Sequence, residues 1–172
     1  MLNREQIKYL IEKKKLMEDF IDLDVQLTPN GFDLTAGKIF EFKSAGILDF
    51  SNSERVVSGI KEIKSLKKNA KDKYGWWDLK RGIYKIRTNE KVNLPKDLIA
   101  LAFPRTSLLR MGGFIQAGVW DAGFEGKSEF ILTVGNPKGI KIKQNARVSQ
   151  MIFIKITKTK HGYNGIYKNL YI

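Results

Sequence analysis

The chain has 172 residues, and its composition of 42% hydrophobic and 11% aromatic residues suits one domain of ordinary size with its own core. Its 31 lysines and arginines exceed its 18 acidic residues, and the formal charge of +13 favours an anionic partner such as nucleic acid, nucleotide phosphates or an acidic surface. The absence of cysteine excludes disulfides, thiol nucleophiles and cysteine-based zinc sites, and the single histidine, His161, excludes histidine-rich metal sites.

The first predicted element is an amphipathic helix over residues 3–21. Apolar side chains recur there at helical spacing, with lysines and glutamates between them, at Ile7, Leu10, Ile11, Met17 and Phe20. The apolar face has no interfacial tryptophan, so we expect the helix to cover a sheet rather than to lie on a membrane. Charges interrupt the first residues too often for a signal peptide, and no apolar run approaches the ~18 residues of a membrane span. We therefore expect a soluble, cytoplasmic protein with no membrane partner.

A turn is predicted next at Pro29-Asn30-Gly31, between strand-like runs that extend to Phe42. Asp33 comes directly after this turn. A carboxylate in such a place either accepts backbone N–H groups and is structural, or takes a direct part in a site. The residues alone leave both interpretations of Asp33 open.

Residues 51–75 form the most basic segment, with six lysines in the sequence GIKEIKSLKKNAKDK. Ile60, Ile63 and Leu66 have the spacing of a helical stripe, but the density of lysine favours a solvated excursion from the core. A lysine cluster can bind nucleic acid, yet no aromatic residues are interleaved with these lysines as stacking platforms. We therefore expect an excursion rather than a nucleic-acid patch.

From Trp76 onward the apolar residues follow the period of strands. The predicted strand residues are Ile83 to Arg87, Leu98 to Phe103, Phe130 with Leu132 and Val134, Ile140 with Ile142, and Ile152 with Ile154 and Ile156. Many short strands at regular spacing predict a mainly β fold, a distorted β-barrel or jelly-roll-like sandwich preceded by one helix, as a single domain over residues 1–172. The tail, residues 159–172, follows the last strand, and we expect its His161 to be exposed rather than catalytic.

Residues 104–126 combine cations, hydroxyls and one carboxylate. Arg105, Thr106, Ser107 and Arg110 are donors suited to a phosphate chain, and Asp121 follows after a short loop. A single carboxylate at such a place suits activation of water or coordination of a hard metal ion. The segment therefore predicts a site for a phosphorylated ligand.

Four segments, in this order, resemble the motifs of the dUTPase and dCTP deaminase superfamily. They are PNGFDLTA, PRTSLLR, AGVWDAGFEG and RVSQMIF. The second segment is closer to the deaminase-like branch, and the chain as a whole is most similar to a monofunctional dUTPase of that branch. The resemblance implies the distorted β-barrel of these enzymes, a homotrimer with shared active sites, and Mg²⁺ bound mainly through substrate phosphates and water.

The same resemblance implies roles for individual residues. Asp121 would be the catalytic carboxylate that activates water for attack on the α-phosphorus of dUTP, and Asp33 would order the site at the subunit interface. The substrate-binding residues would be Arg105, Thr106, Ser107, Arg110 and Gln150 at the phosphates, Gln116, Gly118 and Val119 at the base, Phe124 beneath the deoxyribose, and Tyr163 and Lys168 in a closing tail. Alternatively, Phe124 is an ordinary core residue.

One departure from the family pattern bears on the reaction. The glutamate that the deaminases carry on the strand after the third motif is replaced here by Ile131 or Thr133, and Glu129 would need a register shift to take its place. This favours a dUTP diphosphatase, which forms dUMP and pyrophosphate. The alternatives are a dCTP deaminase or bifunctional enzyme that uses Glu129, a basic nucleic-acid-binding β-barrel protein, and a nucleotide-binding regulator without turnover.

Overall fold

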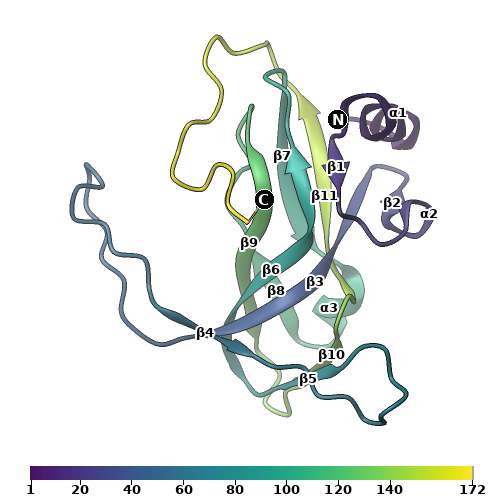
Figure 1. The fold of residues 1–172 in the computed structure, drawn as a ribbon, viewed down its shortest axis with the longest axis vertical. Coiled ribbons are helices and arrows are strands. Elements are labelled where there is room, and N and C mark those ends of the chain that lie inside the picture. Colours follow the sequence, from purple (N-terminus) through teal and green to yellow (C-terminus); the bar gives the residue numbers. More distant parts are fainter. Residues whose placement is uncertain (172) are drawn as a thin grey trace.

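The computed structural model describes residues 1–171, and strands make up most of the ordered structure (Figure 1). The helices are α1 (Arg4–Lys14), α2 (Leu23–Gln26) and α3 (Thr106–Arg110). The strands are β1 (Met17–Glu18), β2 (Leu27–Thr28), β3 (Gly31–Phe42), β4 (Ile60–Ile63), β5 (Trp76–Leu79), β6 (Gly82–Asn93), β7 (Leu98–Pro104), β8 (Gly113–Gln116), β9 (Glu125–Val134), β10 (Ile140–Lys143) and β11 (Arg147–Lys155). The expected mainly β fold with an N-terminal helix is confirmed.

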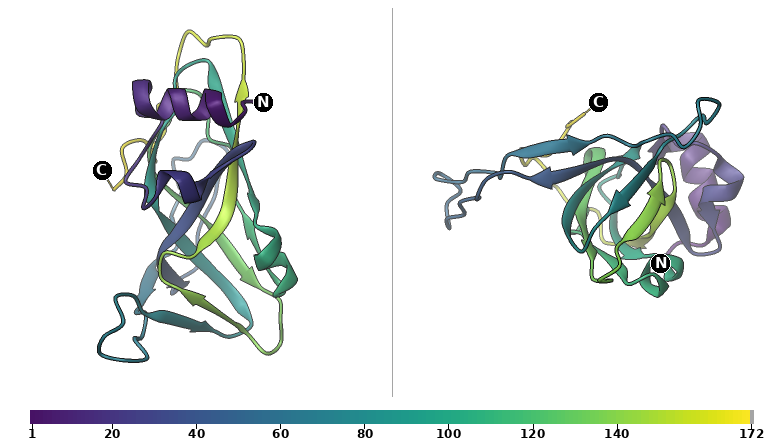
Figure 2. Two further views of the ribbon diagram at one scale, coloured as in Figure 1. Left: turned by 90° about the vertical axis from the view of Figure 1, so that its right-hand side faces the viewer. Right: turned by 90° about the horizontal axis from the view of Figure 1, so that it is seen from below.

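The strands form a sheet that curls into an almost closed barrel. Its hydrogen-bonded order is β7-β11-β3-β6-β9-β8, with β1 on β6, and β2 and β4 on β3, and all of these pairs are antiparallel. A bridge between Ala100 and Trp120 joins β7 to the segment between β8 and β9, so the two ends of the sheet lie close together (Figure 2). The strands β10 and β5 form a separate two-stranded sheet.

Alternation along the strands divides interior from exterior. In β9, Phe130, Leu132 and Val134 are buried in the core, whereas Glu129 and Ile131 lie on the outer face. In β11 the buried side chains include Met151 and Phe153, and the predicted series Ile152 and Ile154 occupies the half-buried outer face. The prediction of a strand was right, but apolar residues on both faces hide which face is internal.

The N-terminal helix is shorter than the range 3–21 predicted from its periodicity. It begins after the N-cap Asn3 and ends at Lys14, where Lys15 adopts a left-handed conformation with φ of 54°. Met17 is buried because it lies in β1, which pairs with β6, and Phe20 packs edge-on against Phe32. The later apolar residues thus match helical spacing while they enter the core from a strand and a loop.

The segment between β3 and β5 leaves the barrel twice. The first excursion is a long hairpin that stands away from the body, and the second is the loop of residues 64–75 (Figure 1). Between them, β4 pairs with the end of β3, so Ile60 and Ile63 lie on a strand and not on a helix. Among residues 1–171, no helix is long and apolar enough to cross a membrane.

Candidate active site

Asp33 is the buried centre of a charge cluster on one wall of the barrel. Its side chain is 2% exposed, and its Oδ2 atom lies 3.0 Å from Arg105 Nε and 3.2 Å from Arg147 Nη1. Burial raises the pKa of Asp33, and the two guanidinium groups offset part of this rise. One carboxylate therefore fixes two arginines side by side, and each keeps further N–H donors for an anion.

The predicted phosphate-binding residues gather beside this cluster. Thr106, Ser107 and Arg110 are exposed on α3, which is attached to the barrel by the buried Leu108. Gln150 pairs with Asp33 across the β11–β3 ladder, and its Nε2 atom donates to Thr28 Oγ1 at 2.6 Å. The first, second and fourth sequence motifs thus meet at one end of β7. Exposed cations and hydroxyls lie there around the buried Asp33 and Leu108.

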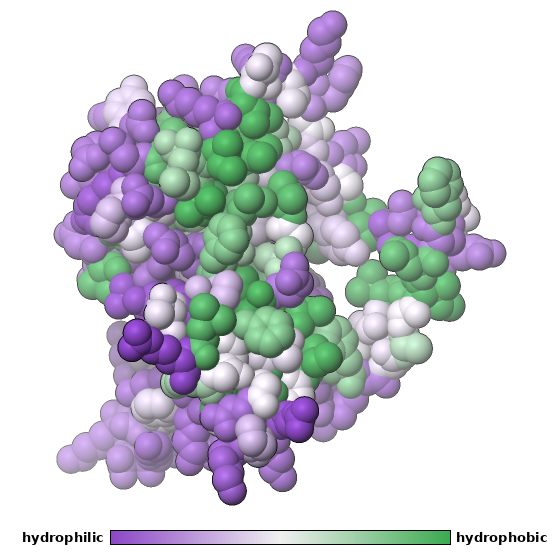
Figure 3. Space-filling view, turned by 180° about the vertical axis from the view of Figure 1, so that it is seen from behind, coloured by the Kyte–Doolittle hydropathy of each residue, from purple (hydrophilic) through white to green (hydrophobic). Residues whose placement is uncertain are grey.

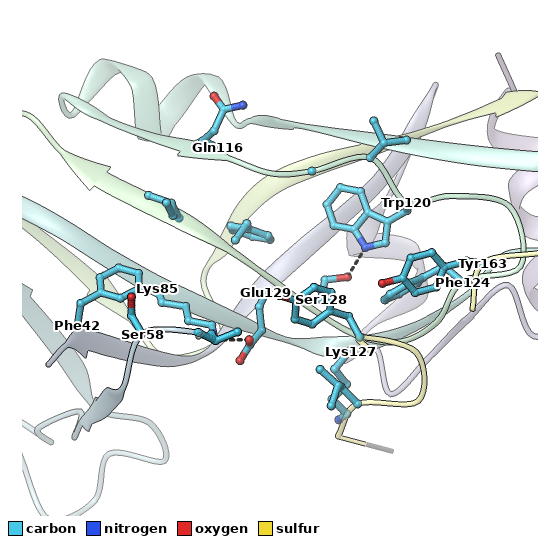
Figure 4. A pocket seen from close by; sticks show the side chains of 17 residues that line it. Phe42, Ser58, Lys85, Gln116, Trp120, Phe124, Lys127, Ser128, Glu129 and Tyr163 are labelled. Carbon is cyan, nitrogen blue, oxygen red and sulfur yellow. Dashed lines mark hydrogen bonds and ion pairs between the residues drawn. The ribbon is translucent and has the colours of Figure 1, made fainter. Parts of the chain in front are cut away.

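A cavity of about 510 Å³ lies on a different wall, over the outer face of β6 and β9 (Figure 4). This volume is in the range of small-molecule sites. The cavity is bounded by the segment from β8 to Trp120, by the outer face of β9, by the base of the long hairpin and by the tail. The predicted residues that line it are Gln116, Gly118, Val119, Phe124 and Tyr163.

Phe124 has both of the roles considered for it. It is a buried member of the core, and its ring also faces the cavity, where it lies 5.7 Å from the ring of Tyr163 (Figure 4). Trp120 is buried beside it, and its Nε1–H donates to Ser128 Oγ at 2.9 Å. These contacts give the cavity a rigid aromatic wall.

Asp121 lies on the turn between the two cavity residues Trp120 and Phe124. Its side chain is exposed, and its carbonyl oxygen accepts a hydrogen bond of 3.0 Å from the Phe124 N–H. Gly123 completes the turn with φ of 83°, and a Cβ atom there would lie 2.9 Å from Gly162 Cα. The turn therefore holds a solvent-accessible carboxylate next to the aromatic wall.

Glu129 faces the cavity but is held by two cations. Arg87 Nε lies 2.9 Å from its Oε1 atom, and Lys85 Nζ contacts its Oε2 atom (Figure 4). All three side chains are 16–17% exposed. Glu129 shares the outer face of β9 with Ile131, two residues further on, because a two-residue step in a strand preserves the face.

The cluster of Asp33, Arg105 and Arg147, called the phosphate-side cluster below, lies far from Asp121 on the same chain. Trp120 pairs with Ala100 on β7, whereas Arg105 is five residues further along the chain, just past the end of β7, a distance of about 16 Å at the usual rise per residue. The bridge is antiparallel, so Asp121 lies opposite Ile99 and further still from Arg105. Within a single chain, the candidate base Asp121 therefore lies far from the candidate phosphate donors.

The tail folds back over β9 of its own chain. The Tyr163 N–H donates to the Ala122 carbonyl at 2.7 Å, and the Asn169 N–H donates to the Glu125 carbonyl at 2.7 Å. Tyr163 thereby reaches the cavity, whereas Lys168 is half-buried and outside the lining formed by residues 1–171. His161 is exposed, as expected for a tail residue.

The sequence profile of the dCTP deaminase-like family matches residues 1–156. The chain belongs to this family. It is 42% identical over 171 residues to a probable deoxyuridine 5'-triphosphate nucleotidohydrolase of Methanosarcina mazei, covering 98% of this chain and 96% of that protein. It is also 33% identical over 172 residues to a dUMP-forming dCTP deaminase of Persephonella marina, covering 98% and 91%. The fold is that of the 2'-deoxycytidine 5'-triphosphate deaminase of Agrobacterium tumefaciens, with a TM-score of 0.64, 22% identity, and coverage of 91% of this chain and 47% of that one.

Three side chains of the candidate site were not found from the sequence. Arg147 begins the fourth motif, but its contact with Asp33 depends on the β11–β3 pairing. Lys85 and Arg87 are the polar positions of an alternating strand, and they meet Glu129 because β6 pairs with β9. The sequence shows that Glu129, Lys85 and Arg87 occupy polar positions of two strands. It does not show the register that brings them together.

Proposed function

We propose that this member of the dCTP deaminase-like family is a dUTP diphosphatase, which hydrolyses dUTP to dUMP and pyrophosphate. The observation that carries the proposal is the cavity face of β9. Neither residue at the place where the family resemblance puts the deaminase glutamate, Ile131 or Thr133, is an acid, and both oxygens of the nearby Glu129 are engaged by cations. The similarity to proteins named deoxyuridine 5'-triphosphate nucleotidohydrolase supports the same reaction.

In the proposed reaction, the Asp121 carboxylate orients a water molecule and takes its proton. The water oxygen forms a bond to the α-phosphorus, and the bond from that phosphorus to the oxygen bridging to the β-phosphate breaks. Pyrophosphate leaves with that oxygen. The solvent-accessible position of Asp121 supports this role, since a general base must reach the attacking water.

We assign the phosphate chain to the donors around α3. Arg105 and Arg110 supply guanidinium groups, and Thr106 and Ser107 supply hydroxyls. Asp33 acts as a positioning residue, because it holds Arg105, and Gln150, whose side chain also ties β11 to β2, is assigned to the phosphates. Donors held in place before the substrate arrives stabilise developing charge without reorganisation.

We assign the nucleoside to the cavity. Phe124 would lie beneath the deoxyribose, and the backbone around Gln116, Gly118 and Val119 would read the uracil edge. Tyr163 would cover the nucleoside from the tail, and Lys168, outside the lining, would reach it only after a rearrangement of the tail. The aromatic contact between Phe124 and Tyr163 supports this placement.

Mg²⁺ fits this site as an ion carried in by the substrate. Among residues 1–171 there is no group of three or more histidine, cysteine or acidic side chains able to hold a metal ion. Mg²⁺ keeps several waters and is commonly bound through phosphate oxygens with few protein ligands. When bound it would neutralise phosphate charge, while Arg105 and Arg110 hold the remaining oxygens.

We further propose that the enzyme is a cytoplasmic homotrimer in which neighbouring chains share each site. The separation of Asp121 from the donors around Arg105 supports sharing, because one triphosphate has to touch both. The cavity of one chain would then face the phosphate donors of the next. A particle mass of one chain in light scattering would contradict this arrangement.

A second candidate reaction is deamination of dCTP. It is favoured by the position of Glu129, whose carboxylate does face the cavity, and by the similarity to a dUMP-forming dCTP deaminase. Incubation with dUTP and with dCTP, with pyrophosphate and ammonia measured separately, decides between the reactions. We expect pyrophosphate from dUTP and no ammonia from dCTP. Ammonia from dCTP would show deamination, and salt-sensitive binding of DNA without any hydrolysis would support the nucleic-acid-binding alternative.

A further inference from the structure

The long hairpin of residues 44–58, called the arm below, is an ordered structure. Ile47 and Val56 exchange two backbone hydrogen bonds of 2.9 Å, and the Gly59 N–H donates to Ser44 Oγ at 2.8 Å at its base. At its tip, the Asp49 carboxylate accepts hydrogen bonds from the backbone N–H groups of residues 51, 53 and 54. Its shape is therefore set before it meets any partner.

The arm exposes apolar side chains to an unusual extent. Phe50 is fully exposed, at 106%, and Leu48 is 81% exposed, while Ile47, Val56 and Val57 are more than half exposed. Figure 3 shows hydrophobic side chains gathered on the arm, which a gap separates from much of the body, and the Arg55 guanidinium of the arm lies 6.0 Å from the centre of the Tyr167 ring in the tail. A preformed hairpin with apolar residues together on it is typical of a protein contact surface.

The charge of the arm favours a second copy of this chain as the partner. The arm carries two acidic residues, Asp49 and Glu54, and one basic residue, Arg55, within a chain of formal charge +13. It is therefore attracted to the basic surface of another copy and repelled by nucleic acid or an anionic membrane.

The position of the arm identifies the part of the second copy that it meets. Val57 and Ser58, at its base, line the nucleoside cavity. If that cavity faces the phosphate donors of the next chain, the arm has to reach the surface around the next chain's Arg105. Two exposed apolar residues flank Arg105 in the sequence, Phe103 at 54% and Leu109 at 50% exposure.

We propose that the arm of one chain docks its Leu48 and Phe50 onto Phe103 and Leu109 of a second copy, and so holds the first chain's cavity against the second chain's phosphate donors. This inference rests on the shared site proposed above. The contact is heterologous, because different surfaces meet, and three such contacts close a ring. The arm thus acts as a clasp that completes the site.

Cross-linking tests the contact directly, because the chain has no native cysteine. Phe50→Cys and Phe103→Cys chains, carrying tags of different size, are co-expressed and treated with a short bis-maleimide. We expect links between the two kinds of chain. The matched control replaces Phe50→Cys by Leu66→Cys, which is also an exposed apolar position but lies in the other excursion, and it should not link. Absence of links from position 50, or equal linking from position 66, would overturn the proposal.

A second test uses the Leu48→Ser/Phe50→Ser variant, with Leu66→Ser as its control. We expect the variant to need at least ~10-fold more protein than the wild type to reach the full oligomer mass and full dUTP hydrolysis, with the control unchanged. Wild-type assembly in the variant, or Phe50-dependent sedimentation with phosphatidylcholine vesicles, would contradict the arm contact. Hydrolysis by the wild type is measured alongside, so that failure of the arm proposal in an active enzyme leaves the proposed reaction standing.

Discussion

Two carboxylates buried in the barrel wall are stabilised by different kinds of partner. Asp33 contacts two guanidinium groups, whereas Glu90 accepts hydrogen bonds from the Thr35 N–H at 3.0 Å, the Thr35 hydroxyl at 2.6 Å and Gln26 Nε2 at 2.8 Å. Burial raises the pKa of Glu90, and these hydrogen bonds oppose the rise only in part. Glu90 therefore makes the free energy of unfolding depend on pH. Asp33 attaches Arg105 and Arg147 to the barrel.

The Glu90→Gln variant isolates this linkage. The raised pKa means that the stabilising contribution of Glu90 is fully present below its ordinary pKa of 4.5 and is lost as pH rises through the folded-state value. The free energy of unfolding of the wild type minus that of Glu90→Gln should therefore fall with rising pH, by about 1.4 kcal/mol for each unit by which the pKa is raised. Urea unfolding between about pH 4 and pH 8 measures this difference.

Glu62→Gln provides a control of opposite sign. The hydrogen bond from Lys38 lowers the pKa of Glu62, so its contribution is present above 4.5 and is lost as pH falls. The wild-type minus variant difference should rise with pH for Glu62 and fall for Glu90. A flat or rising difference for Glu90 would contradict the pKa direction derived from its burial.

Asp121→Asn tests the proposed general base. The amide keeps the size of the side chain but cannot take a proton, so nucleotide binding should persist while dUTP hydrolysis slows at least ~100-fold, in the range that general base catalysis contributes. Steady-state kinetics and equilibrium binding of a nonhydrolysable dUTP analogue measure the two effects. Asp78→Asn is the control, because Asp78 is exposed and contacts Lys141 on the separate β5–β10 sheet. Turnover close to that of the wild type would remove Asp121 from this role.

At the scale of elements, α1 depends on a capping box at its first turn. Asn3 Oδ1 accepts from the Gln6 N–H at 3.0 Å, and Gln6 Oε1 accepts from the Asn3 N–H at 3.1 Å. Asn3→Ala should lower the free energy of unfolding by about 1 kcal/mol, because it leaves a helix N–H without its partner. Asn3→Ser should recover most of this loss, since serine also caps. Equal urea midpoints for all three proteins would show that the cap does not limit stability.

The strands were largely predictable because their signal is local. Phe130, Leu132 and Val134 recur at every second residue, so the sequence predicts the strand, and these three residues form its buried face. In β11 the residues from Met151 to Ile154 are apolar on both faces, so Ile152 and Ile154 predict the strand but do not show which face is internal. The helix end was missed because Met17 and Phe20 kept the helical spacing after the chain had left the helix.

The candidate site was predictable where its residues are close in the sequence and unpredictable where they meet across strands. Arg105, Ser107 and Asp121 stand out because their motifs are continuous. Arg147 reaches Asp33, and Lys85 reaches Glu129, only through the pairings of β11 with β3 and of β6 with β9. Pairing register depends on the whole barrel, so a local pattern does not reveal it.

At the scale of the whole molecule, the barrel determines how a site can be assembled. The cavity to which we assign the nucleoside lies over β6 and β9, and the cluster around Asp33 lies on β3, β11 and the end of β7. Each half is anchored by buried contacts, so a large movement within one chain would have to break the sheet. The proposed association of chains would bring the two halves together without such a movement.

Mixing two inactive variants tests this assembly. Asp121→Asn damages the half that supplies the base, and Arg110→Ala damages the phosphate half at an exposed position that leaves the Asp33 cluster intact. If neighbouring chains share each site, random association of the two variants in equal amounts gives sites in which both halves are undamaged. About a quarter of the sites in a closed ring should then be active, and dUTP hydrolysis should recover to about a quarter of the wild-type rate.

The control mixes Arg110→Ala with Ser107→Ala, two changes in the same half. Every phosphate half then carries one lesion whichever chains associate, so mixing should give no activity beyond the mean of the separate variants. If activity recovers in the first mixture and not in the control mixture, Asp121 and Arg110 of one site come from different chains. Absence of recovery, in a mixture that light scattering shows to contain both variants in one particle, would place both residues of each site on the same chain and would require the tail or the turn at Asp121 to move across the barrel.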